Sequence, residues 1–251
     1  MENNKFIPRR YGFPHYLNEP FWLFDTDAKI KAHPKYQDAK AGGVEAALEL
    51  VSDVALEFLV SIKDRLPSDA IYVAPHAREA SGDNAIPQVL ATAAAIVAEG
   101  VIEVDIVQVT KVYHTGADPM ERMCLRPEFE GAVIQGGKYV LVDDVTSMGG
   151  TLVELSNFIH TSGGTVAAVI VLVNAGRIQQ LQPTNKVISE LERRYKHEIE
   201  EIFGITPCAL TANEANYLIG FRSADEIRNR LVKARKETNL RLRSKGIERK
   251  G

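Results

Sequence analysis

Two adjacent carboxylates stand directly before a loop that is rich in glycine and hydroxyl side chains. Asp143 and Asp144 follow the short apolar run Tyr139 to Val142, and they precede the sequence Val145-Thr146-Ser147-Met148-Gly149-Gly150-Thr151. Glycines let a backbone approach a ligand closely, and backbone N–H groups at the start of a helix hold phosphate groups. The carboxylates can accept hydrogen bonds from sugar hydroxyls or lie beside a metal ion. Together these residue types favour a ribose 5-phosphate as the ligand.

The spacing of this run excludes two other phosphate-binding loops and leaves one plainer interpretation open. A Walker loop is excluded because no Lys follows the glycines, and a dinucleotide-binding loop is excluded because the G-x-G-x-x-G spacing is absent. The plainer interpretation is structural: the acidic pair caps a helix and the glycines connect a strand to it, as in any doubly wound sheet.

The segments around this run alternate between strand and helix patterns. Apolar residues recur at helical spacing from Val44 to Ile62. Further along, the pattern predicts strands at Ala70–Ala74, Val104–Val109, Tyr139–Val142 and Thr165–Val173, and helices at Ile86–Glu99 and Gly150–Ser162. This order predicts an α/β fold, a parallel twisted sheet flanked by helices. Ligands bind such sheets at the carboxyl ends of the strands, where the acidic pair is expected.

Both ends of the chain differ from the expected core at residues 44–180. Residues 1–43 are rich in Pro and aromatic residues and lack periodicity, which predicts an irregular N-terminal arm. This arm either covers the edge of the sheet or forms a hood that stacks a base. Residues 181–251 are expected to be a helical C-terminal extension, with one helix from Lys186 to Phe203 and two more after the capping boxes Thr211–Glu214 and Ser223–Glu226.

Composition and charge are those of an ordinary globular protein. With 45% hydrophobic and 25% charged residues, the chain is neither disordered nor fibrous. Cys124 and Cys208 have no metal-binding spacing and are expected to be free thiols. No apolar run approaches membrane-spanning length, and no apolar segment follows the basic start of the chain. We therefore expect a soluble, cytoplasmic protein without membrane contact.

Positive charge is concentrated near the C-terminus. The net charge is −3, yet residues 221–251 contain eleven Lys and Arg against four Asp and Glu. Clustered positive charge is typical of nucleic-acid binding, whereas acidic residues interspersed within it are typical of a solvated helix face. We favour the solvated face and keep nucleic-acid binding as the alternative.

The run from Tyr139 to Leu152, and above all its D-D-V-T-S-M-G-G-T sequence, resembles the ribose-phosphate signature of the type I phosphoribosyltransferases. A looser likeness extends from about Ile71 to Arg177 and is closest to the competence-linked members. The resemblance implies a phosphoribosyltransferase that binds phosphoribosyl pyrophosphate with Mg²⁺. Such an enzyme transfers the ribose 5-phosphate to a nitrogenous acceptor and releases pyrophosphate. We also expect a homo-oligomer, namely a dimer.

The resemblance assigns roles to the acidic pair and to the loop. Asp143 and Asp144 would be catalytic residues that contact the ribose hydroxyls and the magnesium ion. The substrate's phosphate would bind in the loop that follows, formed by Val145, Thr146, Ser147, Met148, Gly149, Gly150 and Thr151.

Basic residues for the pyrophosphate are expected in two other segments. Arg78 follows the first core strand, and its guanidinium offers paired donors to phosphate oxygens. The segment Lys111 to Gly131 corresponds to the mobile hood loop of the family, with Lys111, Arg122 and Arg126 as candidates; we favour Lys111 as the catalytic one. The alternative is that these residues are solvated surface groups.

The acceptor is not defined by the sequence. Where the purine salvage members of the family carry an acidic residue in the loop, this chain has Ser147, which argues against hypoxanthine or guanine. Two other functions remain open. The chain could be a non-catalytic protein of the same fold that senses phosphoribosyl pyrophosphate or a nucleotide and signals through its basic C-terminal helices. It could also act on another phosphorylated ribose.

Overall fold

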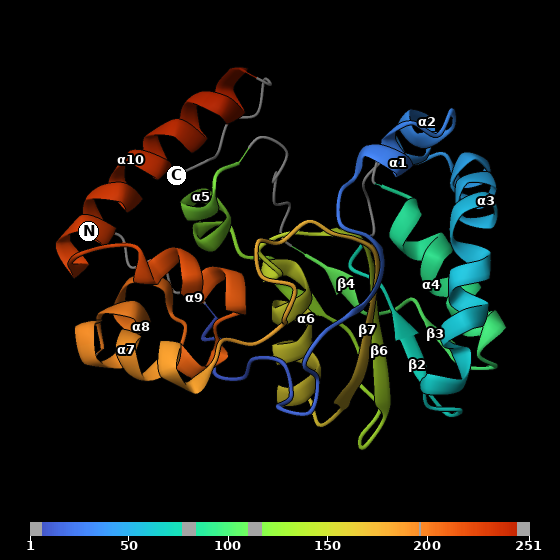
Figure 1. Ribbon diagram of the computed structural model, residues 1–251, viewed down its shortest axis with the longest axis horizontal. Helices are drawn as coiled ribbons and strands as arrows, with labels where there is room; N and C mark the ends of the chain where they lie inside the picture. Colours follow the sequence, from blue (N-terminus) through green and yellow to red (C-terminus); the bar gives the residue numbers. More distant parts are fainter. Residues whose placement is uncertain (1–6, 77–83, 110–116, 196, 245–251) are drawn as a thin grey trace.

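The protein has a central parallel sheet with helices on both faces and a helical extension to one side (Figure 1). The computed structural model describes residues 7–76, 84–109, 117–195 and 197–244. Five strands form the sheet in the order β1-β7-β6-β2-β3, and each neighbouring pair is parallel. Their bounds are β1 Phe21–Phe24, β2 Ile71–Val73, β3 Val101–Glu103, β6 Lys138–Thr146 and β7 Thr165–Asn174. The expected α/β fold class is confirmed.

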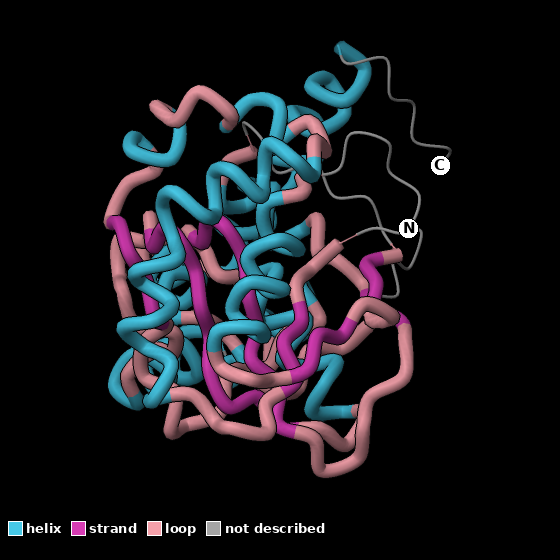
Figure 2. Tube along the Cα trace, turned by 90° about the vertical axis from the view of Figure 1, so that its right-hand side faces the viewer, coloured by secondary structure: helices cyan, strands magenta, loops and turns pink. Residues whose placement is uncertain are grey.

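Apolar side chains cover both faces of the sheet, because alternate residues of a strand point to opposite sides. Val140 and Val142 of β6 belong to one buried cluster, while Tyr139 and Leu141 belong to a second cluster on the other face. Helices α3 and α4 cover the first face and α6 covers the second, with bounds Val44–Ile62, Ile86–Val97 and Gly150–Thr161. The strands run side by side in Figure 2, and Figure 1 shows them between α6 and the pair α3 and α4.

Between α4 and β6 the chain departs from the single strand expected at Val104–Val109. The strand of the main sheet is β3, which lies earlier, and β4 (Val107–Gln108) pairs antiparallel with β5 (Phe129–Glu130) in a separate two-stranded sheet. Val101 is exposed in β3, whereas Ile106 is fully buried. The more apolar segment therefore produced the stronger pattern, although it is not the one that joins the main sheet.

The segment expected as a long loop from Lys111 to Gly137 also contains a short helix. Helix α5 (Pro119–Cys124) begins with a capping box that the sequence analysis did not identify. The Asp118 carboxylate accepts hydrogen bonds from the backbone N–H groups of Met120 and Glu121, and the Glu121 carboxylate accepts one from the Asp118 N–H. This end of the expected hood loop is therefore fixed by local hydrogen bonds.

The N-terminal arm is more regular than the sequence predicts. Strand β1 forms an edge of the main sheet beside β7, and two short helices follow, α1 (Ala28–Lys31) and α2 (Tyr36–Lys40). The prediction of an irregular arm was wrong for this part, because elements of four or five residues are too short to show a period. Of the two roles considered for the arm, β1 performs the covering of the sheet edge.

The C-terminal extension is helical and has an apolar core of its own. The single helix expected up to Phe203 is two helices, and Gly204 ends the second one with a φ of 66°. The box at Thr211 is complete, whereas Ser223 Oγ only accepts the N–H of Glu226. The helices are α7 Asn185–Tyr195, α8 Glu198–Phe203, α9 Ala212–Ile219 and α10 Ala224–Ser244, and the 3-10 turns of the chain are η1 Lys63–Arg65 and η2 Pro207–Ala209.

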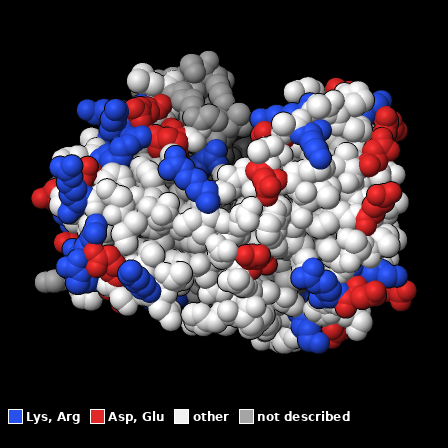
Figure 3. Space-filling view, in the orientation of Figure 1, with Lys and Arg blue, Asp and Glu red and all other residues white. Residues whose placement is uncertain are grey.

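None of the helices in the described part of the chain is long and apolar enough to cross a membrane. Figure 3 shows Lys and Arg side chains gathered over the C-terminal helices with acidic side chains among them. Arg228 of α10 pairs with Asp225, and Lys233 pairs with Glu237. Such short-range pairs are typical of a solvated helix face, and the choice between this face and nucleic-acid binding stays a prediction.

Candidate functional site

The acidic pair lies within β6, as its sixth and seventh residues, and not after it. The strand continues to Thr146, so Asp143 and Asp144 are held by parallel pairing with β7, in which Asp143 lies opposite Val171. The carboxyl end of β6 is central in the sheet, between β7 and the shorter β2. The backbone at Asp143 is fixed by β7, whereas the pairing with β2 ends at Leu141, and this support suits a residue that must keep its direction.

The Asp144 carboxylate is buried and accepts hydrogen bonds on both of its oxygens. Its Oδ2 accepts from the Lys40 ammonium at 2.7 Å and from the Asn84 amide at 2.9 Å, and its Oδ1 accepts from the Val145 N–H at 2.8 Å. The exposed fraction of Asp144 is only 4%. Lys40 comes from the end of α2 in the N-terminal arm, and sequence analysis gave no sign of it.

Asp143 has a different environment from its neighbour. One of its oxygens accepts the Asp144 N–H at 2.9 Å. Burial first, and then the negative charge of Asp144, raise the pKa of Asp143 well above the ordinary value of an aspartic acid. For Lys40, burial alone would lower the pKa, but the charge of Asp144, the hydrogen bond to it and the nearby Tyr36 and Asp143 together outweigh burial, so the pKa is raised. A carboxyl group with a raised pKa at the end of a central strand is a sign of a functional site.

The loop after β6 turns directly into helix α6. It consists of Ser147, Met148 and Gly149, and Gly149 is the residue before the helix, with a φ of 77° that is unfavourable for any residue with a side chain. The first N–H groups of a helix have no partner within it, and the helix dipole makes this end positive. These features suit an anion, and the binding of a phosphate by this loop stays a prediction.

Arg122 is the basic residue of the expected hood loop that lies at this anion site. Its guanidinium donates to Ser147 Oγ at 2.6 Å and to the Ala117 carbonyl at 3.0 Å. Arg126 points elsewhere and donates to the Glu154 carboxylate and to the Phe203 carbonyl. The other two basic candidates, Arg78 and Lys111, lie outside the described residues.

Helix α10 holds the helix that carries Arg122. Thr238 Oγ1 donates to the Glu121 carboxylate at 2.6 Å, and both groups are buried. Arg230 of α10 pairs with Asp118, the residue that caps α5. The basic C-terminal helix is thus connected through α5 to the phosphate loop, a link that no local sequence pattern predicts.

The phosphate loop is supported from behind by helix α9 and the N-terminal arm. Thr211 at the start of α9 donates to the Met148 carbonyl at 2.6 Å. Glu214 closes the capping box with Thr211 and pairs with Arg9 at 2.6 Å. The Arg9 side chain is fully buried and also lies 3.2 Å from the Glu154 carboxylate of α6. Thr211 and Glu214 were recognised in the sequence as a helix start, but their contact with the loop was not.

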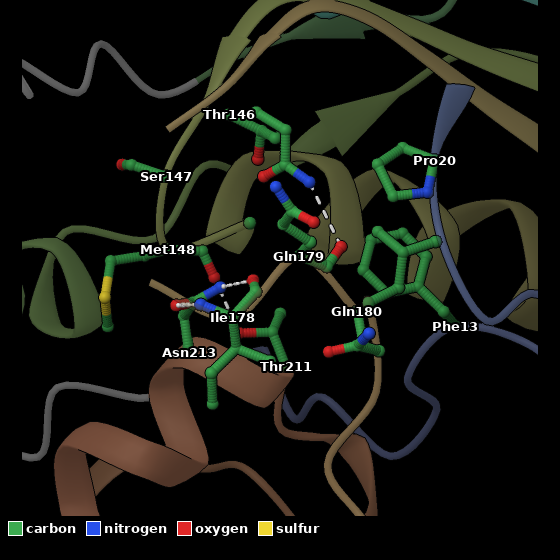
Figure 4. A pocket seen from close by; sticks show the side chains of 13 residues that line it. Phe13, Pro20, Thr146, Ser147, Met148, Ile178, Gln179, Gln180, Thr211 and Asn213 are labelled. Carbon is green, nitrogen blue, oxygen red and sulfur yellow. Dashed lines mark hydrogen bonds between the residues drawn. The ribbon is translucent and has the colours of Figure 1, made fainter. Parts of the chain in front are cut away.

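A small pocket lies on this supporting side of the loop (Figure 4). It is formed between the residues Thr146 to Gly149 and the chain after β7, including Asn174 and Gln179. Its volume is about 10 Å³, which is about the space of one water molecule. In Figure 4 the side chain of Ser147 points away from this pocket. The carboxyl end of β6 at Asp143 and the loop that Arg122 contacts, and not this pocket, are therefore the candidate ligand site.

Replacing Gly149 with valine should lower the free energy of unfolding by about 2–3 kcal/mol, because a β-branched residue is strained at positive φ. The new Cβ would also lie 3.3 Å from Thr211 Cγ2. Gly150→Ala is the matched control: its Cβ would meet only Glu214 Oε1 at 3.5 Å, and its φ is not positive. We expect that variant to be as stable as the parent or slightly more stable. Urea unfolding measures both, and equal stability of the two variants would contradict the left-handed conformation at Gly149.

Comparison with known proteins gives two curated relatives and a set of solved structures. Protein TraN of Escherichia coli is 37% identical over 215 residues, which cover 83% of this chain and 48% of that protein. An uncharacterized protein of Haemophilus influenzae is 35% identical over 130 residues, which cover 51% of this chain and 29% of that protein. The chain therefore spans about half the length of the first relative and under a third of the second. No family model matches the chain.

Two of the similar solved structures are adenine phosphoribosyltransferases. The enzyme from Thermoanaerobacter pseudethanolicus has 19% identity and a TM-score of 0.33, with 51% of this chain and 72% of that chain covered. The enzyme from Leishmania tarentolae has 15% identity and a TM-score of 0.34, with 63% and 92% covered. The function of the chain is therefore inferred from the residues at the end of β6 and from the loop before α6.

Proposed function

We propose that this chain binds phosphoribosyl pyrophosphate and transfers its ribose 5-phosphate to a nitrogenous acceptor with release of pyrophosphate. One observation carries the proposal. A half-buried carboxyl with a raised pKa, Asp143, lies near the end of a central strand, four residues before the first residue of the loop that Arg122 contacts. A sugar phosphate has hydroxyl donors at one end and a dianion at the other, and these two ends match the two halves of the site.

The phosphate of the ligand would bind to the loop from Val145 to Thr151. Backbone N–H groups at the start of α6 would donate to the phosphate oxygens. The Ser147 hydroxyl, which now accepts from Arg122, would donate to the same phosphate, either in place of its contact with Arg122 or beside it. The ribose hydroxyls would donate hydrogen bonds to the Asp143 carboxylate. Arg78 and Lys111 remain our proposed contacts for the pyrophosphate, by resemblance alone.

The expected magnesium ion fits only part of the acidic pair. Both oxygens of Asp144 already accept hydrogen bonds, one of them from an ammonium group. Asp143 has one donor on one oxygen. Among the described residues, no group of three or more His, Cys, Asp or Glu is placed to hold a metal ion. The two carboxylates therefore suit a metal ion that would be bound mainly by the pyrophosphate oxygens. Of the two, only Asp143 would be a ligand of that ion. Such an ion would offset the charge of the departing pyrophosphate.

Transfer of the ribose requires no nucleophile from the protein. The bond from C1 to the pyrophosphate oxygen breaks, C1 takes on positive character, and a nitrogen of the acceptor then forms the new bond. The contribution of the chain is to fix the ribose through Asp143, to fix the phosphate through the loop, and to place positive charge near the leaving group. Arg122, which donates to Ser147 in the loop, would help to hold the 5-phosphate, and the charge near the leaving group would come from Arg78 and Lys111.

Calorimetry tests the proposal by measuring the binding of phosphoribosyl pyrophosphate to the parent and to Arg122→Ala. A hydrogen bond from a charged group is worth about 1.5–3 kcal/mol, so the affinity should fall roughly 10- to 150-fold. Arg193→Ala is the control, because Arg193 lies exposed on α7 and pairs only with Glu190 in a contact one helical turn away. If the parent gives no heat at millimolar ligand, the proposed function fails. If the parent binds and Arg122→Ala binds equally well, the role of Arg122 fails.

A ligand sensor of the same fold is the second candidate, and one observation favours it. Helix α10 holds α5 through Thr238 and Glu121, and α5 places Arg122 on the phosphate loop. Ligand binding could therefore change the position of α10 and its basic surface. Pyrophosphate release with a panel of purine, pyrimidine and orotate-like acceptors separates the two functions. Tight binding with no turnover on any acceptor would favour the sensor.

A further inference from the structure

Lys40 reaches the candidate site from a distant part of the chain. It ends helix α2 in the N-terminal arm, 104 residues before its partner Asp144, and its Nζ lies 2.7 Å from Asp144 Oδ2. The side chain of Lys40 is 34% exposed and that of Asp144 is 5% exposed. The ammonium group is therefore partly withdrawn from water while it faces a buried carboxylate, and such a pair is screened less than one on the surface.

Backbone contacts fix the position of this ammonium group. The Ala85 N–H donates to the Ala39 carbonyl at 3.1 Å, which ties the end of α2 to the residue that precedes α4. Lys40 and Asn84 are the next residues on either side of this hydrogen bond, and both donate to the same oxygen of Asp144. Ala39 itself is fully buried. The hydrogen bond between Ala85 and Ala39 thus brings two donors from separate elements to one oxygen of Asp144.

The groups already bound to the Asp144 carboxylate disfavour a divalent ion there. A magnesium ion binds carboxylate oxygens at about 2.0–2.1 Å and demands a regular octahedral shell. Oδ2 already accepts from Lys40 and Asn84, and Oδ1 accepts from the Val145 N–H. An ammonium group 2.7 Å from Oδ2 would also repel a cation on the same oxygen.

We propose that Lys40 is the resident cation of the acidic pair, which occupies the position at Asp144 that a divalent metal would otherwise take. Lys40 neutralises Asp144, so that only Asp143 is left for the hydroxyls of a sugar or for an ion that the ligand brings. The relevance of this arrangement to phosphoribosyl pyrophosphate rests on the proposed function, but the competition between Lys40 and a metal does not depend on it.

Binding of Mn²⁺ alone tests this, with the loss of the free Mn²⁺ signal in electron paramagnetic resonance as the measurement. Carboxylate oxygens bind Mn²⁺ as they bind Mg²⁺. The parent should show no Mn²⁺ binding that depends on Asp144. Lys40→Met should create a site, with affinity raised at least about tenfold, which corresponds to about 1.4 kcal/mol. The added substitution Asp144→Asn should remove this site again.

Lys35→Met is the matched control, because Lys35 precedes the same helix but pairs with Glu49 on α3, at 3.3 Å. It should bind Mn²⁺ as the parent does. Lys40→Gln is a second variant without the charge, should Lys40→Met fold poorly, and thermal unfolding checks both. Two outcomes would overturn the proposal: Mn²⁺ binding to the parent that Asp144→Asn weakens, or folded Lys40 variants that gain no binding. Failure of the parent to bind phosphoribosyl pyrophosphate leaves the Mn²⁺ result intact and overturns only the proposed function.

Discussion

Replacing Arg9 with methionine should lower the free energy of unfolding by about 3–5 kcal/mol, the cost of removing one partner from a buried ion pair. The Arg9 side chain has no exposed surface. It lies 2.6 Å from Glu214 and 3.2 Å from Glu154, and these two carboxylates are nearly as buried as the arginine. Methionine fills a similar volume without charge, so the carboxylate of Glu214 loses its only buried cationic partner among the described contacts.

Arg10→Met is the control for this prediction. Arg10 is the next residue, and its side chain is exposed, so its replacement should change stability by less than about 0.5 kcal/mol. Urea unfolding of both variants, followed by circular dichroism, gives the comparison. Similar stabilities for Arg9→Met and Arg10→Met would contradict the buried network.

Loss of Arg9 should also affect the phosphate loop. Glu214 caps α9 together with Thr211, and Thr211 donates to the Met148 carbonyl in the loop. Arg9 is therefore two contacts away from the proposed phosphate, through residues that are all buried or nearly so. The N-terminal arm and the C-terminal extension therefore both contribute to the stability of the part that carries the motif.

The sequence was sufficient to locate the candidate anion site because that site is local. The apolar run, the acidic pair, the glycine turn and helix α6 follow one another within about 24 residues, from Lys138 to Thr161. Strand alternation and helix periodicity act over the same short range. The one local correction is that β6 extends through the acidic pair to Thr146, since polar residues at the end of a strand weaken its apolar pattern.

The partners of the acidic pair could not be predicted in the same way. Lys40 is 104 residues from Asp144, and Arg9 is 205 residues from Glu214. Such contacts depend on the packing of whole elements, and a single sequence contains no periodic signal for them. Strand β1 was missed for a related reason: its four residues become a strand by pairing with β7.

The start of helix α5 does have a local signature in the sequence. Asp118-Pro119-Met120-Glu121 combines an N-cap residue, a proline at the first helical position and an acidic residue three positions after the cap. This signature begins α5 and would have separated Arg122, on a helix, from Arg126, beyond its end. It would also have favoured Arg122 as the basic residue whose position is fixed.

The Asp143→Asn variant should be more stable than the parent at neutral pH and should bind the ligand much more weakly. Burial and the charge of Asp144 raise the pKa of Asp143 in the folded protein. The folded state therefore binds a proton more readily than the unfolded state, and the stability of the parent falls as the pH rises from the unfolded value upward. At a pH above the folded-state pKa, each unit by which burial raises the pKa of Asp143 lowers the free energy of unfolding by about 1.4 kcal/mol. Asparagine has the same shape without the charge, so the gain in stability should grow with pH.

Asp144→Asn is the matched variant, and it should have the opposite effect. Asp144 accepts hydrogen bonds from Lys40, Asn84 and the Val145 N–H, so its replacement should cost about 1–3 kcal/mol. Urea unfolding at several pH values gives the stabilities, and calorimetry gives the affinities. A stabilising Asp144→Asn, or an Asp143→Asn variant that loses stability at neutral pH, would contradict these environments.

Opposite effects at two adjacent carboxylates would separate a functional group from a structural one. A carboxylate kept for the fold has partners that satisfy its charge, as Asp144 has in Lys40. The Asp143 carboxyl is held where its charge is unfavourable until a ligand donates hydrogen bonds to it, and that cost is recovered only in the complex. If Asp143→Asn gains stability while it loses affinity, the unfavourable charge is a property of the binding site. If it gains stability and binds as before, Asp143 is not the group that contacts the ribose, and the site must lie nearer to Arg122.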